Sequence, residues 1–104
     1  MTDTEKMKKL NNHSEFNKYN GIVVTQVDSG TAVVETVLGS NSMNPWRSAH
    51  GGLIFAMCDV AAGVAASDVG GQCVTQSGNI YFLRPAVGTK LRAVGTVIKH
   101  GKTV

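Results

Sequence analysis

Aromatic residues, cysteine and proline are all scarce in this chain. Of its 104 residues, 6% are aromatic, two are cysteine and two are proline. Cys58 and Cys73 form no CxxC pair and no cluster with histidine at zinc-ligand spacing, so the sequence predicts no metal site. Free cysteine is among the most buried residue types, and we expect both thiols to be buried in a reducing compartment.

The chain also has little excess charge and no leader-like segment. Its formal charge is +3, and its basic residues are not interleaved with aromatic ones as in many nucleic-acid-binding proteins. The basic residues near the end would suit a small anionic ligand that carries phosphates. Residues 1–20 are polar, and the apolar run Leu53–Ala66 is too short to span a bilayer. We expect a cytoplasmic protein that binds neither nucleic acid nor membrane.

The order of β-branched and apolar segments predicts one α+β domain. Residues 1–20 form a polar, partly helical lead-in, and residues 21–104 form the domain. Within it we expect strands at 21–27 and 31–38, a helix at 51–67, strands at 73–83 and 90–99, and the start of a fifth strand at 102–104. The short connection Asp28-Ser29-Gly30 predicts that the first two strands form a hairpin.

The stretch Ala49–Ser67 is almost wholly apolar but carries one carboxylate, Asp59. Its length and composition predict a helix that is buried on all sides. An ionised carboxylate is costly to bury unless neighbouring groups compensate it. Asp59 is therefore either a structural residue bonded to a nearby backbone or hydroxyl group, or part of a functional site.

His50-Gly51-Gly52 lies where a loop becomes this helix. Backbone N–H groups of a first helical turn lack intrahelical partners, and glycine lets a ligand approach them closely. Such a helix start can polarise a carbonyl oxygen, although it can equally be a plain loop-to-helix turn. Asp59 lies about 13 Å from His50 along the helix axis. At this distance Asp59 cannot easily act on the same carbonyl as Gly51 within one subunit, but it can do so across a two-fold axis between two copies.

These motifs combine with two later ones, Asn79–Ala86 (NIYFLRPA) and Lys99–Lys102 (KHGK). Together, over residues 20–104, they resemble the hotdog-fold acyl-CoA thioesterases of the PaaI-like, phenylacetate-pathway type. The resemblance implies an antiparallel sheet wrapped around a long central helix. It also implies homodimers or homotetramers with active sites at the dimer interface, and a hydrolase that acts on acyl-CoA without a metal or redox cofactor.

The resemblance further implies roles for individual residues. Asp59 would be the catalytic carboxylate, as nucleophile or general base, and the Gly51 N–H of the facing subunit would polarise the thioester carbonyl. Asn44 would orient the water or thioester, His50 would shape the helix start and contact the thioester region, and the Thr75 hydroxyl would assist. Taken from the residues alone, Asn44 next to Pro45 is a turn-forming residue. The residues implied for CoA binding are Gly52, Arg84, Lys99, His100 and Lys102.

Members of this family continue beyond the point where the sequence stops. We therefore expect a hotdog sheet that lacks its last strand or strands and has an open edge. Hydrolysis of an acyl-CoA thioester is the leading functional prediction. The alternatives are a hotdog module that binds acyl-CoA without cleaving it, or a truncated, inactive remnant. The acyl group, and the choice between dimer and tetramer, stay open.

Overall fold

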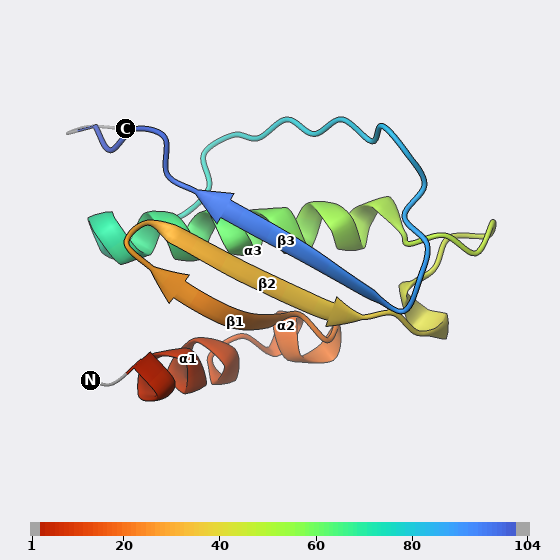
Figure 1. Cartoon of the computed structure of the whole chain (residues 1–104), viewed down its shortest axis with the longest axis horizontal. Coiled ribbons are helices and arrows are strands. Elements are labelled where there is room, and N and C mark those ends of the chain that lie inside the picture. Colours follow the sequence, from red (N-terminus) through yellow and green to blue (C-terminus); the bar gives the residue numbers. More distant parts are fainter. Residues whose placement is uncertain (1–2, 102–104) are drawn as a thin grey trace.

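The computed structural model describes residues 3–101, which form a three-stranded sheet with a long helix on one face (Figure 1). The strands lie in the order β1-β2-β3, and both pairs are antiparallel. The elements in chain order are α1 (Asp3–Asn12), α2 (Glu15–Tyr19), β1 (Val23–Asp28), β2 (Thr31–Val37), the 3₁₀ turn η1 (Ser40–Ser42), α3 (Gly51–Gly70) and β3 (Lys90–Thr96).

The predicted hairpin is confirmed. β1 pairs with β2 up to Asp28 opposite Thr31, and the two residues between them, Ser29 and Gly30, have φ angles of 47° and 82°. A two-residue hairpin turn whose twist matches the strands has positive φ at both central residues. Ser29 and Gly30 adopt these angles here. The strand predicted at 90–99 is also found, as β3, and it ends at Thr96 rather than Lys99.

The lead-in folds into α1 and α2, which lie along β1 (Figure 1). The Asn11 side chain donates to the Val24 carbonyl at 3.0 Å and accepts from the Val24 N–H at 2.8 Å. These two hydrogen bonds dock the end of α1 on the backbone of β1. Nearer the start of α1, the Lys6 ammonium is ion-paired with the Asp68 carboxylate of α3.

One stripe of α3 packs against the sheet. Met57, Ala61 and Ala65 are buried at a spacing of four residues, which places them on the same helical face. On the strand side, a Cβ added to Gly95 would lie 2.7 Å from the Ala61 carbonyl group. Glycine in β3 therefore allows the sheet to approach the helix backbone closely.

The prediction that the helix is buried on all sides is wrong. Phe55, Cys58, Asp59 and Ala62 are exposed, and both cysteines are free and exposed rather than buried. Hydropathy predicted the helix but cannot say how many of its faces the same chain covers.

At 20 residues and a mean hydropathy of 1.6, α3 also has the length and composition of a membrane span. Core helices of soluble proteins pass that test too, so it is weak evidence.

The strand predicted at Cys73–Leu83 is absent from the structure. Residues 72–84 run extended alongside α3 and return to the start of β3 (cyan in Figure 1), without pairing to any described strand. A strand requires a hydrogen-bonded neighbour, and this segment lies away from the edge of β3. The predicted fifth strand, at 102–104, falls outside the described residues.

Candidate active site

The start of α3 is built around His50. Its ring Nδ1 accepts a hydrogen bond from the Gly52 N–H at 2.9 Å, and its carbonyl accepts from the N–H groups of Leu53 and Ile54. These contacts satisfy the N–H groups that follow Gly51. Within residues 3–101 the Gly51 N–H itself has no acceptor. It is a free donor at the positive end of a 20-residue helix.

Asn44 shapes the loop before the helix. Its side-chain oxygen accepts from the N–H groups of Trp46 and Ser48 at 3.0 and 3.1 Å, and its Nδ2 donates to the Ser48 hydroxyl at 2.7 Å. The amide is therefore engaged within its own turn, as the residues alone suggested. Asn44 still lines the same cavity as Gly51.

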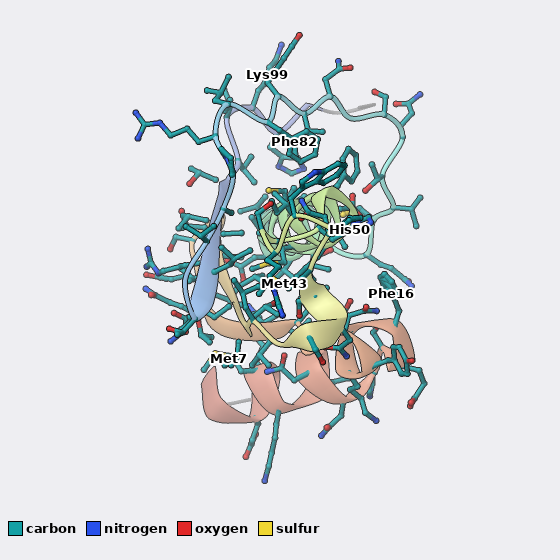
Figure 2. The ribbon with its side chains drawn as sticks, turned by 90° about the vertical axis from the view of Figure 1, so that its right-hand side faces the viewer. Met7, Phe16, Met43, His50, Phe82 and Lys99 are labelled. Atoms are coloured by element: carbon teal, nitrogen blue, oxygen red, sulfur yellow. The ribbon has the colours of Figure 1, made fainter. Side chains whose placement is uncertain are left out.

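This cavity at the helix start has a volume of about 470 Å³. Figure 2, a view along α3, shows Phe82 of the extended segment above the helix and His50 beside it. A Cβ on Gly51 would lie 3.4 Å from the Phe82 ring, so Phe82 covers Gly51 directly. Arg84 lines the same cavity. Phe82 lies in the NIYFLRPA motif, but its residue type alone predicted no role at the helix start.

A second cluster lies midway along α3. Thr75 of the extended segment donates through its Oγ1 to Asp59 Oδ1 at 2.5 Å. Both residues are exposed, so the carboxylate is not the buried charge that the sequence predicted. The structure thus brings together two of the predicted catalytic residues, from segments separated by 16 positions.

The residues predicted to bind CoA are not all together. Lys99 and His100 line a cavity of about 540 Å³ with Thr75, and the His100 ring packs against Gly70 at the end of α3. Arg84 lies in the other cavity, at the start of α3. Gly52 is exposed in the first helical turn, and Lys102 falls outside the described residues.

In one chain, therefore, Gly51 and Asp59 lie in two separate clusters. Gly51 and Asp59 are eight residues apart, which is roughly 12 Å along a helix. The cavity that holds Gly51, Asn44 and Arg84 shares no lining residue with the cavities that hold Asp59 and Thr75. The structure of a single copy does not unite the free N–H with the carboxylate.

Electrostatics within the described chain single out a different carboxylate. The Lys6 ammonium and the Gly30 N–H lower the pKa of Asp68 below its ordinary 3.8. Asp68 joins α1, α3 and the hairpin turn, which is a structural role. Across residues 3–101, no group of three or more His, Cys, Asp or Glu is placed to hold a metal.

Comparison with known proteins identifies relatives. The chain is 35% identical over 83 residues to the acyl-coenzyme A thioesterase PaaI of Escherichia coli. The solved structure of E. coli PaaI matches with a TM-score of 0.82 at 30% identity, covering 96% of this chain and 71% of that one. A conserved protein of Pseudomonas aeruginosa matches with a TM-score of 0.84 at 26% identity, covering 97% and 79%.

These matches confirm the predicted α+β hotdog fold, with its long central helix and antiparallel sheet. The chain spans 59% of the length of the curated E. coli protein. The family model of the thioesterase superfamily matches residues 48–104, which include the helix start, Asp59 and Thr75. The chain therefore belongs to the thioesterase superfamily.

Proposed function

We propose that the protein hydrolyses an acyl-CoA thioester to a free acid and CoA, in a site shared by two copies of the chain. The observation that carries this proposal is the Asp59 carboxylate, held by Thr75 on an exposed helix face. The free Gly51 N–H supplies the complementary group. The naming of the E. coli relative as an acyl-coenzyme A thioesterase supports the substrate class.

Helix geometry supports a shared site. When two α3 helices pack antiparallel about a two-fold axis, each residue of one copy faces a residue of the other. The two residue numbers add up to the same value for every facing pair. An axis near Phe55 sets Gly51 of one copy opposite Asp59 of the other. Phe55 is 39% exposed and lines a cavity with Asp59, so it lies on the correct face. Two copies would then form two equivalent sites.

The chemistry divides between the two clusters, which act as half-sites. The Gly51 N–H donates to the thioester carbonyl oxygen and stabilises the negative charge that develops there. Asp59 takes a proton from a water whose oxygen bonds to the carbonyl carbon. The carbon–sulfur bond then breaks, and the proton passes from Asp59 to the departing sulfur. Alternatively, Asp59 attacks the carbonyl carbon itself, the carbon–sulfur bond breaks and CoA leaves as its thiolate. Water then hydrolyses the resulting anhydride, which releases the acid, regenerates the Asp59 carboxylate and supplies a proton to CoA.

Basic residues near both half-sites suit CoA. Lys99 and His100 share a cavity with Thr75, on the carboxylate side, and Arg84 lies on the Gly51 side. Phosphate groups are held by such cationic side chains. We propose that these residues receive the phosphates and pantetheine of CoA, with Gly52 close to the thioester.

The test is release of free thiol from a panel of acyl-CoAs by wild type and Asp59→Asn. We expect the variant to lose a hundredfold or more of kcat, because asparagine can neither accept the proton nor attack. Asp28→Asn, in the exposed hairpin turn, is the matched control and should keep full activity. Unchanged turnover in Asp59→Asn would contradict the proposal.

Isotope labelling separates the two mechanisms. Single turnover in H₂¹⁸O with enzyme in excess places the label in the product acid if Asp59 acts as a general base. If Asp59 is the nucleophile and water attacks the aspartyl carbon of the anhydride, the first turnover releases acid whose new oxygen comes from the carboxylate, and the label enters Asp59. Attack of water on the acyl carbon labels the acid instead, so label in Asp59 is the outcome that establishes the nucleophile. Mass spectrometry of product and protein distinguishes these outcomes.

A binding module is the second candidate, favoured by the exposure of Asp59 in a single copy. Such a module would bind acyl-CoA in calorimetry and release no thiol. Wild-type turnover that disappears in Asp59→Asn would exclude it.

A further inference from the structure

The apolar run Tyr81-Phe82-Leu83 of the extended segment turns one of its side chains toward α3. Tyr81 and Leu83 are 83% and 89% exposed, whereas Phe82 is 55% exposed. Alternate residues of an extended chain point to opposite sides, so the half-buried Ile80 lies on the same side as Phe82. The Phe82 ring lies above the helix in Figure 2. The run therefore directs the ring of Phe82, and not that of Tyr81, at the start of α3.

The Phe82 ring meets Gly51 with its outer edge. Of its atoms, Cζ and Cε1 come closest to the position that a Cβ on Gly51 would take, at 3.4 and 3.5 Å. These are contact distances, so the ring fills the space beside the Gly51 backbone. Gly51 is half-buried, although His50 and Gly52 on either side of it are exposed. Phe82 thus covers a residue whose neighbours in the chain are open to solvent.

A backbone hydrogen bond ties the segment of Phe82 to the loop that carries Gly51. The Ala86 carbonyl accepts from the Ala49 N–H at 2.8 Å. Phe82 and Gly51 each lie only a few residues from this hydrogen bond. The ring is therefore held over the helix start by the fold, even though much of its segment is exposed.

The Gly51 N–H is the donor that the proposed function uses, and water competes for it. A donor exposed to water must give up its solvent before it binds a carbonyl oxygen, whereas a shielded donor is available without that reorganisation. The edge of an aromatic ring carries a slight positive charge, so it can lie next to a developing oxyanion without repelling it. An apolar ring at this place therefore favours the charged transition state.

We propose that Phe82 is a positioning residue of the reaction, which shields the Gly51 N–H from water and keeps it free for the thioester oxygen. The inference rests on the proposed function, and Phe82 acts through Gly51 without accepting or transferring a proton itself. It predicts a loss in kcat rather than in substrate binding, because the oxygen gains its charge only in the transition state.

Amide hydrogen exchange tests the shielding without any substrate. By NMR of wild type, we expect the Gly51 N–H to exchange more slowly than an unshielded peptide amide, although it has no acceptor within residues 3–101. Phe82→Ala should raise its exchange rate about fivefold or more and leave that of the Gly52 N–H, which bonds His50, unchanged. Tyr81→Ala is the matched control: it removes the neighbouring aromatic ring on the opposite side and should change neither rate.

Thiol release from acyl-CoA tests the effect on the reaction. We expect Phe82→Ala to lower kcat about tenfold with little change in KM. Phe82→Leu, which keeps an apolar cover, should recover most of the loss, and Tyr81→Ala should keep full activity. A loss confined to KM, or equal losses in Phe82→Ala and Tyr81→Ala, would overturn the inference.

The two measurements separate this inference from the proposed function. If wild type releases no thiol, the proposed function fails, and hydrogen exchange alone decides whether Phe82 shields the Gly51 N–H. Unchanged Gly51 exchange in Phe82→Ala overturns the inference in either case. If Phe82→Ala does not fold, wild type decides: a Gly51 N–H that exchanges at the rate of an unshielded amide overturns it as well.

Discussion

One hydrogen bond positions the Asp59 carboxylate and leaves its second oxygen without a partner in the described chain. Thr75 Oγ1 donates to Oδ1 of Asp59 at 2.5 Å. An ionised carboxylate has about four acceptor positions, so the second oxygen stays available to a water or a carbonyl carbon. The hydroxyl fixes the orientation of the Asp59 carboxylate, which is what the proposed general base or nucleophile requires.

Thr75→Val should therefore impair turnover with little change in substrate binding. The substitution removes the donor and keeps the side-chain shape. Because hydrogen bonds to charged groups are stronger than neutral ones, we expect kcat to fall about 10- to 100-fold while KM changes little. Steady-state kinetics on the preferred acyl-CoA measures both parameters.

Thr75→Ser is the conservative control, since it retains the hydroxyl and should recover most of the activity. The double variant with Asp59→Asn should be no slower than Asp59→Asn alone, because Thr75 acts through Asp59. An additive loss in the double variant would show that Thr75 works independently.

At the scale of elements, the features with local causes were predictable. The hairpin follows from a serine-glycine turn between two β-branched runs, and α3 follows from a long apolar run after Gly51-Gly52. Each depends on residues close together in the sequence. The position of Gly51 and His50 at the helix start was predictable for the same reason.

Features that depend on distant neighbours were not predictable from residue patterns. Residues 73–83 have strand-like composition, yet they find no described strand to pair with. The apolar run of α3 did not reveal that Asp59 lies on an exposed face. Family resemblance implied that the Thr75 hydroxyl assists at the site, but its contact with Asp59 required the structure. The separation of Arg84 from Lys99 and His100 required it as well.

The ion pair between α1 and α3 makes stability depend on pH. Asp68 accepts from Lys6 and from the Gly30 N–H, and both lower the pKa of Asp68 below 3.8 in the folded chain. Because its pKa is lower in the folded chain, the ionised Asp68 carboxylate contributes its full stabilisation above about pH 4. That contribution is lost as the pH falls through the folded-state pKa of Asp68. Asp68→Asn should cost about 1 kcal/mol at pH 7 and flatten the acid side of the stability profile.

Urea unfolding at several pH values between neutral and strongly acidic measures this effect. Glu15→Gln removes a carboxylate that pairs with Lys18 on the exposed surface, and it should change stability little at any pH. An Asp68→Asn profile parallel to that of wild type would show that the ion pair contributes nothing measurable.

At the scale of the whole molecule, a site shared by two copies makes a specific prediction. Two different inactive variants should regain activity when they combine in one heterodimer. Gly51→Pro removes the free N–H but suits the first position of a helix, and His50 before it already has the extended backbone that proline requires. A heterodimer of Asp59→Asn with Gly51→Pro contains one site with both changes and one with neither. We expect it to have about half the activity of wild type.

Each homodimer serves as the control and should be nearly inactive. Coexpression with two different affinity tags and purification over both resins isolates the heterodimer. An inactive heterodimer would show that Gly51 and Asp59 act within one subunit or not at all.

The docking of Asn11 on Val24 has a consequence for how the sheet can grow. On the edge strand β1, which lies along α1, this side chain engages the N–H and the carbonyl of Val24. On β3 the outward backbone groups meet no described strand. Exposed edges on both sides of a sheet allow copies to add without end, as in fibres. Because Asn11 occupies the backbone groups of Val24, another strand cannot pair with β1 at that position, which opposes open-ended growth of the sheet from this edge.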